Sequence, residues 1–220
     1  VSMTTPLSRT PIALSIAGSD PSGGAGIQAD LKTFSALGVY GTTIITALTA
    51  QNTQGVTGVH AVPPAFIGLQ ADTLAADIEV TAVKTGMLGD AVTVATVVGI
   101  LQKHELGPIV VDPVMVATSG DVLLAPDAIA AVRNLLVPLA TLITPNLHEA
   151  AQLLGTSLAS TVEEMESQAQ RLVAGGARSA LVKGGHATGD MAIDVLVAPH
   201  GISHHAAPRI ETRNTHGTGC

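Results

Sequence analysis

The sequence predicts an α/β protein, a three-layer α/β/α fold built on a central and mostly parallel sheet. Short apolar segments of strand type alternate with helical segments, an order typical of parallel sheets that are covered on both faces. Hydrophobic residues make up 46% of the 220 residues, aromatic residues only 1%, and glycine occurs 23 times. A chain rich in Ala, Val, Leu and Ile suits buried strands and alanine-rich helices.

Residues 11–220 are expected to form a single domain, because no linker, repeat or low-complexity segment interrupts them. Residues 1–10 are expected to be a flexible N-terminal tail. The expected elements, in chain order, are a strand at 11–17, a helix at 27–37, a strand at 42–49, a helix at 64–77, a strand at 81–84, a helix at 91–104, a strand at 108–112, a helix at 126–136, a strand at 141–143, helices at 147–154 and 161–174, a strand at 180–182, and a pair of strands at 191–197 and 202–206.

Local signals justify these elements. The segments 11–17 and 108–112 are almost purely apolar, and 42–49 is rich in β-branched residues, as strands are. Pro64 is tolerated in the first turn of a helix. Thr161 to Glu164 matches a capping box, which marks the start of another helix. The alternation therefore rests on both periodicity and helix-start chemistry.

Composition excludes several classes of function. With 10 basic and 17 acidic residues the net charge is −7, and few aromatic residues are available for base stacking, so no nucleic-acid partner is expected. No uncharged apolar run reaches membrane-spanning length, so no membrane partner is expected either. The single cysteine excludes an internal disulfide framework and indicates a reducing, cytoplasmic location.

Polar residues directly follow many of the expected strands. Ligands of open α/β sheets bind beyond the carboxyl ends of the strands, so these residues predict a site at that edge. The residues are Gly18 to Asp20, Gln51, Asn52, Lys84, Asp112, Asn146 and 183–186.

The first half of the chain offers candidates for binding a small ligand. The glycine-rich loop 18–26 is a candidate backbone-amide nest for an anion, or else a flexible turn between strand and helix. Asp30 can accept a hydrogen bond from a ligand amine, or it is a solvated helix residue. The amide of Gln51 offers a donor and an acceptor to a heterocycle, or it belongs to the turn at 52–55. Met87 is a pocket wall or ordinary core.

The second half offers candidates for charge chemistry. Asp112 ends an apolar strand and can polarise a nucleophile or hold a cation. Asn146 and Glu149 share a helix face and can hold a hydrated Mg²⁺, but they equally match an N-cap with its capping-box partner. Lys183 begins the segment Lys183-Gly-Gly-His186, where a cation beside a flexible turn suits phosphate, or it is a surface lysine.

The segment Thr215–Cys220 is the most specific one. Its two glycines allow consecutive amides to point at one anion, next to the thiol of Cys220. A helix after this point would stabilise negative charge and favour the thiolate, which suits a base or a nucleophile.

Together these segments resemble the hydroxymethylpyrimidine/phosphomethylpyrimidine kinases of thiamine biosynthesis, within the ribokinase-like superfamily. The resemblance runs from about residue 12 to residue 220 and is specific because the motifs occur in the same order. The motifs are AGSDPSGGAGIQADLK at 17–32, TAQNT at 49–53, KTGML at 84–88, VDPVM at 111–115, TPN at 144–146 with Glu149, KGGH at 183–186 and THGTGC at 215–220.

The resemblance implies ATP-dependent phosphorylation of 4-amino-5-hydroxymethyl-2-methylpyrimidine, and then of its monophosphate to the diphosphate. It implies ATP as co-substrate and Mg²⁺ on the nucleotide phosphates, held by Asn146 and by Glu149 through water. Asp112 and Lys183 would lie near the transferred phosphoryl group as catalytic residues. Cys220 would replace the catalytic aspartate of the sugar-kinase relatives. The implied pyrimidine pocket consists of Gly18, Ala25, Asp30, Gln51, Met87 and Val114, and the implied nucleotide and anion site of Asn146, Lys183, Thr215, Gly217, Thr218 and Gly219.

Two alternatives stay open. A pyridoxine kinase of the same fold uses a similar hydroxymethyl heterocycle, and Gln51 disfavours it weakly. The other alternative is a pyrimidine-binding protein without kinase activity, because the family usually continues past the position of Cys220 with a helical part that borders the adenine. The domain at 11–220 is expected to lack that part. The resemblance also implies a homodimer.

Overall fold

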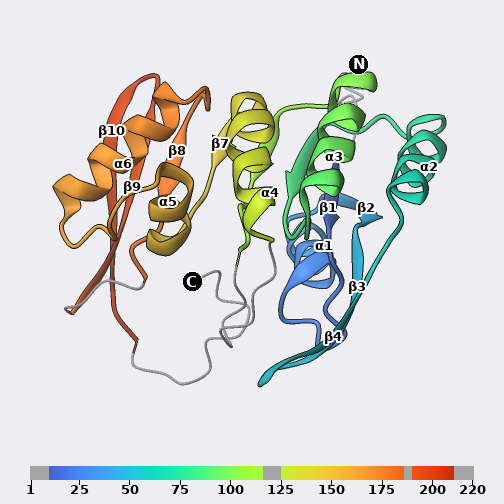
Figure 1. Ribbon diagram of the computed structural model, residues 1–220, viewed down its shortest axis with the longest axis horizontal. Coiled ribbons are helices and arrows are strands. Elements are labelled where there is room, and N and C mark those ends of the chain that lie inside the picture. The colour runs from blue at the N-terminus through green and yellow to red at the C-terminus, as the bar shows by residue number, and fades with distance from the viewer. Residues whose placement is uncertain (1–9, 116–124, 186–189, 211–220) are drawn as a thin grey trace, which may run out of the picture.

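A central sheet of eight strands organises the computed structural model, which describes residues 10–115, 125–185 and 190–210. Its order is β10-β9-β8-β7-β6-β5-β1-β2 (Figure 1). Every neighbouring pair from β2 to β8 is parallel, and β9 and β10 join antiparallel. The strands are β1 (Ile12–Ala17), β2 (Tyr40–Ile45), β5 (Ala82–Thr85), β6 (Ile109–Val111), β7 (Leu142–Ile143), β8 (Ala180–Val182), β9 (Met191–Ala198) and β10 (Gly201–Pro208). The predicted α/β fold with a mostly parallel sheet is confirmed.

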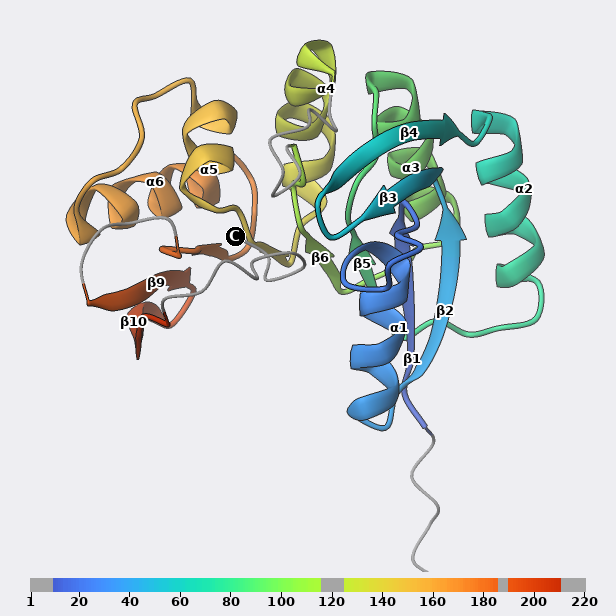
Figure 2. The ribbon, with the colours of Figure 1, turned by 90° about the horizontal axis from the view of Figure 1, so that it is seen from below.

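Helices lie on both faces of this sheet. Figure 2 shows α2 to α6 along one face and α1 on the opposite face. The helices are α1 (Gly26–Ala36), α2 (Pro64–Ala75), α3 (Ala91–Lys103), α4 (Pro126–Ala131), α5 (Leu147–Leu154) and α6 (Val162–Ala174). The expected strands and helices therefore appear in the expected order, apart from three differences described below. The expected tail lies outside the described residues except for Thr10.

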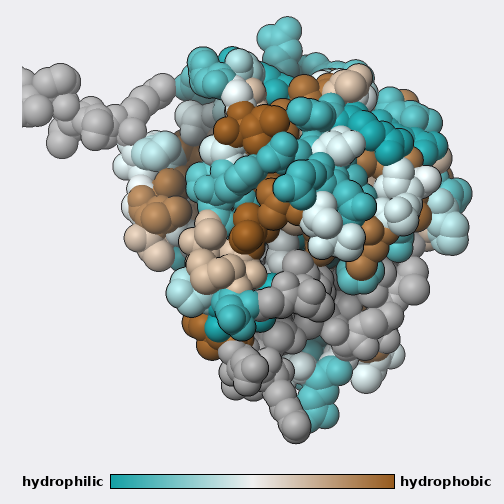
Figure 3. Space-filling view, turned by 90° about the vertical axis from the view of Figure 1, so that its left-hand side faces the viewer, coloured by the Kyte–Doolittle hydropathy of each residue, from teal (hydrophilic) through white to brown (hydrophobic). Residues whose placement is uncertain are grey.

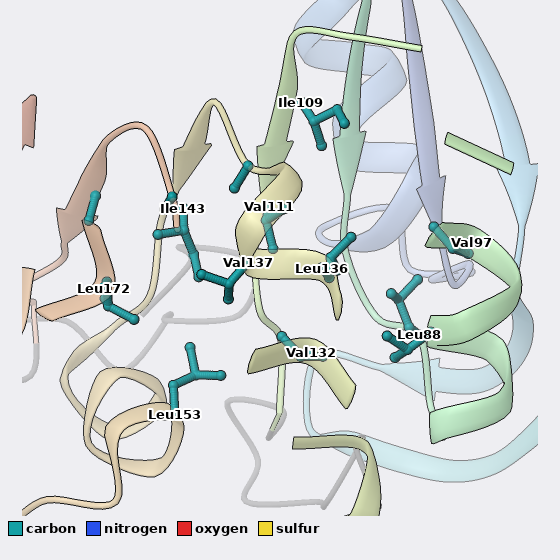
Figure 4. Close-up of a cluster of buried hydrophobic side chains, with 14 of the residues drawn as sticks. Leu88, Val97, Ile109, Val111, Val132, Leu136, Val137, Ile143, Leu153 and Leu172 are labelled. Carbon is teal, nitrogen blue, oxygen red and sulfur yellow. The ribbon is translucent and has the colours of Figure 1, made fainter. Parts of the chain in front are cut away.

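The main hydrophobic core fills the space between the sheet and the helices α2 to α6 (Figure 4). Val111 and Ile143 of the central strands are fully buried against it, as are Val97 of α3 and Leu153 of α5. Burying each side chain of this size contributes roughly 1.5–3 kcal/mol. The core thereby fixes the ends of the strands that carry the polar residues.

The single strand expected at 42–49 is wrong. The chain breaks at Thr46, where the backbone amide donates to Ala17 O (3.0 Å) and the hydroxyl donates to Met87 O (2.7 Å). After this break β3 (Ala47–Asn52) pairs with β4 (Gly55–Ala61) in a separate two-stranded sheet. A run of β-branched residues signals strand geometry but not the point at which a strand leaves one sheet.

The strand β4 was not predicted from the sequence. It is exposed along most of its length, so it lacks the alternation that a half-buried strand shows. The turn that connects it to β3 was predicted, and it is confirmed. The Asn52 side chain accepts from the amides of Gln54 (2.8 Å) and Gly55 (3.2 Å), as in an Asx turn.

The segment expected as a helix at 126–136 is helical, but the type of helix changes along it. Regular α-helix ends with α4, and a π-helical turn at Val132–Leu136 and a 3₁₀ turn at Val137–Leu139 follow. Pro138 lies in the last turn, and a proline ring crowds the carbonyl four residues earlier and lacks an amide hydrogen. The wider turn before Pro138 is consistent with that restriction.

The strand β10 forms one edge of the sheet, and all of its residues are exposed. Figure 3 shows that polar and apolar side chains are mixed on the side of the molecule that carries β10 and α6. His204 of β10 contacts Glu166 of α6, with Nε2 to Oε1 at 2.6 Å. Polar side chains on an outer strand discourage pairing with another chain. Within the described ranges, none of the helices combines the length and the apolar character needed to cross a membrane.

Candidate active site at the carboxyl edge of the sheet

Four charged side chains meet where the central strands end. Lys84 of β5 lies with its Nζ 3.2 Å from Asp30 Oδ1 and 3.7 Å from Asp112 Oδ2. The Nζ of Lys183 lies 3.4 Å from Asp112 Oδ1. Asp30, Lys84, Asp112 and Lys183 therefore form a row of alternating charge, which we call the charged row. The parallel order β1, β5, β6 brings the first three together from distant parts of the sequence.

Asp30 projects from α1 toward the sheet. Its Oδ2 accepts a hydrogen bond from the hydroxyl of Ser15 at 2.6 Å, and Ser15 is fully buried in β1. With the ammonium of Lys84 as second partner, the carboxylate is held by the sheet from two sides. The interpretation of Asp30 as a solvated helix residue is therefore wrong, and its charge belongs to the charged row.

The glycine-rich loop 18–26 is closed by its own aspartate. The buried carboxylate of Asp20 accepts from the amides of Ser22 (2.8 Å), Gly24 (3.1 Å) and Ala25 (2.8 Å). Amides that already donate to an internal carboxylate are not available to an external anion. The hypothesis that this loop is an anion nest is therefore wrong, because three of its amides are already paired within the loop.

Gly18 and Met87 face each other beside this loop. A Cβ atom on Gly18 would lie 2.7 Å from Met87 Cε, so the glycine allows the two segments to approach closely. Gln51 lies next to them, because Thr49 Oγ1 is 2.8 Å from Ser19 O and 3.1 Å from Gln51 Oε1. Three of the predicted pocket residues are thus grouped around the end of β1.

The remaining predicted pocket residues flank this group. The amide of Ala25 is fixed by Asp20, at the start of α1. Val114 follows Asp112 directly, and its amide donates to Asp112 O at 2.9 Å. Val114 therefore belongs to the β6 end of the edge, where it adjoins the charged row.

Asn146 and Glu149 form a complete capping box at the start of α5. The Asn146 side chain accepts from the Glu149 amide (2.9 Å), and Glu149 Oε2 accepts from the Asn146 amide (2.8 Å). The capping hypothesis is therefore confirmed. The same residues adjoin the charged row, because Asn146 pairs in a parallel bridge with Lys183 and Pro145 O accepts from the Lys183 amide at 2.9 Å.

Burial raises the pKa of the Glu149 carboxyl to about 7, and the nearby charge of Asp112 adds to this effect. The hydrogen bond from the Asn146 amide and the charge of Lys183 act in the opposite direction. Glu149 is only 6% exposed. The cost of ionising it would be reduced by a cation placed beside it.

The residues at this edge fit Mg²⁺. Among the described residues, no group of three or more His, Cys, Asp or Glu side chains is placed to hold a metal ion. Mg²⁺ does not need such a group, since it keeps several waters and takes one or two protein carboxylates. Glu149, whose burial disfavours an unpaired charge, is suited to that role beside Asp112. The capping role and the cation role are therefore compatible.

Gly184, the residue after Lys183, is closely packed against β9. The Gly184 amide donates to Asp194 Oδ1 of β9 at 2.8 Å. A Cβ atom on Gly184 would overlap the carbonyl of Ile193, so only glycine fits at this position. Because Lys183 is paired with Asp112 and mostly shielded, the interpretation as a surface lysine is wrong.

The glycine-rich segment near the C-terminus lies outside the described residues. The predicted roles of Thr215, Gly217, Thr218, Gly219 and Cys220 therefore stay predictions, and His186 is outside the described part as well. The structure also shows two contributors that the sequence did not single out: Ser15, which is hidden inside an apolar run, and Asp194, which accepts from the Gly184 amide. Asp20 was named only as one of the polar residues after the first strand, and the structure shows that it holds amides of the loop 18–26. Lys84 gave a usable signal, because a lysine between buried strand residues is uncommon.

Solved structures that are similar to this chain include small-molecule kinases. A phosphomethylpyrimidine kinase from Clostridium difficile 630 superposes with a TM-score of 0.83 at 42% identity, covering 89% of this chain and 84% of that one. A Bacillus subtilis pyridoxal kinase in complex with ADP gives a TM-score of 0.87 at 39% identity, covering 96% and 80%. The fold and these structural relatives thus show a small-molecule kinase of the ribokinase-like class.

Sequence comparison names the family. The model of the phosphomethylpyrimidine kinase family matches residues 20–220. The hydroxymethylpyrimidine/phosphomethylpyrimidine kinase of Rhizobium meliloti (strain 1021) is 54% identical over 211 residues, which are 96% of this chain and 79% of the relative. The enzyme of that name from Escherichia coli (strain K12) is 50% identical over 208 residues, 94% and 78%. The chain belongs to the phosphomethylpyrimidine kinase family, which confirms the resemblance seen in its motifs.

Proposed function

We propose that the protein transfers the γ-phosphoryl group of ATP to the hydroxymethyl oxygen of 4-amino-5-hydroxymethyl-2-methylpyrimidine, and then phosphorylates the monophosphate to the diphosphate. The observation that carries this proposal is the pair of Lys183 and Asp112 at the carboxyl edge, in a chain 54% identical to a kinase of that name. Phosphoryl transfer requires alignment and charge neutralisation more than covalent chemistry, and the charged row supplies both.

In the first step a lone pair of the hydroxymethyl oxygen attacks the γ-phosphorus of ATP. The new O–P bond forms while the bond from the γ-phosphorus to the β,γ-bridging oxygen breaks, and ADP leaves with that oxygen. The hydroxyl proton passes to a base, a role that we propose for Cys220. In the second step an oxygen of the monophosphate attacks in the same way, and it needs no deprotonation when that phosphate is fully ionised.

The described residues divide into a phosphoryl part and a pyrimidine part. We propose that Lys183 neutralises charge on the transferred group, as an ammonium near phosphate does. We propose that Asp112 orients Lys183 through their ion pair. Mg²⁺, when bound, would neutralise the nucleotide phosphates, and Glu149 and Asn146 would hold it. The proposed pyrimidine-binding residues are Gly18, Ala25, Asp30, Gln51, Met87 and Val114.

The residues around Gly18 and Met87 support the proposed pyrimidine-binding site. Gly18 and Met87 offer an apolar wall, and the hydroxyl of Thr49, which donates to Ser19 O beside Gly18, also donates to Gln51 Oε1. Apolar walls with a few fixed polar groups are typical of small-molecule pockets. The flat ring would lie against Met87, with its amino edge toward Gln51.

A pyridoxine kinase is the second candidate function. It is favoured by the structural relatives, since the Bacillus subtilis pyridoxal kinase shares 39% identity and the Staphylococcus aureus pyridoxal kinase in complex with pyridoxal shares 33%. Measuring kcat/KM for the pyrimidine and for pyridoxine under the same conditions decides between them. Our proposal requires the pyrimidine to be preferred at least tenfold, on the order of the discrimination that one polar contact supplies.

Calorimetry distinguishes the proposed kinase from a pyrimidine-binding protein without kinase activity. Titration with the pyrimidine and titration with Mg-ATP are measured independently. A response to both supports the proposed kinase, whereas a response to the pyrimidine alone supports the binding protein. A homodimer and a cytoplasmic location are carried over as predictions from the resemblance and the single cysteine. Light scattering of the purified protein tests the first.

A further inference from the structure

Lys84 is the charged residue of the otherwise uncharged strand β5. Its neighbours Val83 and Thr85 are buried on one face of the sheet, so Lys84 lies on the opposite face, which α1 covers. In the parallel ladder it is paired with Ser15 of β1. Lys84 is therefore directed toward α1 and the charged row rather than toward the main core.

The ammonium of Lys84 is shared between two carboxylates. It lies 3.2 Å from Asp30 Oδ1 and 3.7 Å from Asp112 Oδ2, and Lys183 occupies the other oxygen of Asp112 at 3.4 Å. Asp112 is thus flanked by one ammonium group at each of its oxygens. All of these side chains are mostly shielded from solvent, with 16–23% of each side chain exposed.

The backbone keeps space for this ammonium. A Cβ atom on Gly86 would lie 3.1 Å from Lys84 Nζ and 3.0 Å from Ala17 Cβ. Gly86 has no positive φ, so its backbone conformation does not require glycine. A glycine is needed here because a side chain would crowd Lys84 and Ala17. This is a second observation, independent of the ion pairs, that the fold is built around the position of Lys84.

We propose that Lys84 is a positioning residue that keeps Asp112 ion-paired when Lys183 turns to the nucleotide phosphates. If Lys183 were the only partner of Asp112, its departure would leave a shielded carboxylate without a counter-charge, which is costly. With Lys84 at the second oxygen, Asp112 stays paired and Lys183 is released at a smaller cost. This inference rests on the proposed function, because it assigns Lys183 to phosphate.

The test is a double-mutant cycle on nucleotide affinity, measured by calorimetry with Mg²⁺ and a non-hydrolysable ATP analogue. Lys84→Met is expected to weaken binding by about three- to tenfold, in the range of coupling between groups in contact. In an Asp112→Asn background the same substitution is expected to change binding by less than about twofold, because Lys183 is already released. Lys84→Arg, which keeps the charge, is expected to bind within about threefold of the unaltered protein.

Lys103→Met is the matched control. Lys103 also pairs with an aspartate, Asp72, at 2.6 Å, but on the exposed surface between α2 and α3. It is expected to leave nucleotide affinity unchanged. Equal weakening by Lys84→Met in both backgrounds would show a direct electrostatic effect or an effect through Asp30, and would overturn the inference. No weakening at all, or an arginine variant as weak as the methionine variant, would overturn it too.

Failure of the inference and failure of the proposed function give different results. An unaltered protein that does not bind the nucleotide analogue contradicts the proposed function, and the inference falls with it. Normal binding by the unaltered protein without a dependence on Lys84 contradicts the inference alone. Because the cycle measures binding and not turnover, the identity of the phosphate acceptor does not affect it.

Discussion

The Nζ of Lys183 lies 3.4 Å from Asp112 Oδ1, although 71 positions separate the two residues in the sequence. Asp112 follows β6 and Lys183 follows β8, and these strands, separated by β7, place both residues at one edge. The bridge to Asn146 fixes the backbone of Lys183 there. A cation paired with a carboxylate is held in place before phosphate arrives. In the proposed reaction this pairing keeps Lys183 close to the place where the nucleotide phosphates bind, and Lys183 then turns from Asp112 to them.

Lys183→Met is expected to lower kcat by about 10²- to 10³-fold, as the loss of one group that stabilises transition-state charge does. The KM for the pyrimidine is expected to change less, because we propose that Lys183 contacts the transferred phosphoryl group and not the pyrimidine. Steady-state kinetics measure both constants. Lys103→Met, which removes an exposed ion pair elsewhere, should keep the kcat of the unaltered protein. A kcat for Lys183→Met within tenfold of normal contradicts the assignment.

Asp20→Asn is expected to destabilise the protein by about 1–3 kcal/mol, since the carboxylate holds several amides of the loop 18–26 and is itself buried. The KM for the pyrimidine is expected to rise as well, because the loop positions Gly18 and Ala25. Chemical denaturation and kinetics measure the two effects. The exposed Asp77→Asn serves as control. If both variants unfold at the same denaturant concentration, the carboxylate does not hold the loop.

The stability of the protein is expected to depend on pH through Glu149. Folded Glu149 keeps its proton up to about pH 7, whereas the unfolded chain releases it near pH 4.5. Between these values the folded state binds more protons, so the free energy of unfolding falls as pH rises, by at most about 3 kcal/mol. Glu149→Gln removes this titration, and its amide oxygen can still accept from the Asn146 amide.

The measurement for Glu149 is the difference in unfolding free energy between the variant and the unaltered protein, taken without Mg²⁺ across this range. We expect the difference to move in favour of Glu149→Gln from pH 4.5 to pH 7 and to level off above it. Addition of Mg²⁺ at pH 8 is expected to reduce the difference, since a cation favours the carboxylate. A difference that is constant with pH contradicts the raised pKa.

Two glycine-to-alanine substitutions are expected to have opposite signs. Gly184→Ala places a Cβ atom against the Ile193 carbonyl and should destabilise the protein by about 1–3 kcal/mol. Gly99→Ala lies within α3 with no heavy atom within 4 Å of the new Cβ, and should stabilise it by about 0.5–1 kcal/mol. Thermal unfolding compares the two. Equal shifts in Tm would show that Gly184 is not tightly packed against Ile193.

The sequence predicts the alternation of strands and helices because the strands of a parallel sheet are short and apolar, and Pro64 and Thr161 mark helix starts by local chemistry. It does not predict β4, whose exposed residues carry no alternation. Nor does it locate the break at Thr46, because that break is made by hydrogen bonds to Ala17 and Met87. Departures of this kind are set by tertiary contacts that no local pattern contains.

The candidate site, like the fold, could be predicted from the sequence only in part. The positions of Asp112 and Lys183 directly after expected strands are enough to name them as candidates, and the topology predicts that residues after parallel strands meet at one edge. The contacts of Asp20 depend on the conformation of the loop 18–26, and those of Lys84 depend on the register between β1 and β5. Neither can be derived from the local sequence. For Asn146 and Glu149 the sequence left two interpretations open, and the structure shows the cap while remaining compatible with a cation.

The most direct test of the proposed function is mass spectrometry of the products after incubation of the protein with 4-amino-5-hydroxymethyl-2-methylpyrimidine, Mg²⁺ and ATP. We expect two products in succession, the monophosphate and then the diphosphate, each formed with one equivalent of ADP. Absence of both products, from a protein that remains folded under the assay conditions, would contradict the proposed kinase activity.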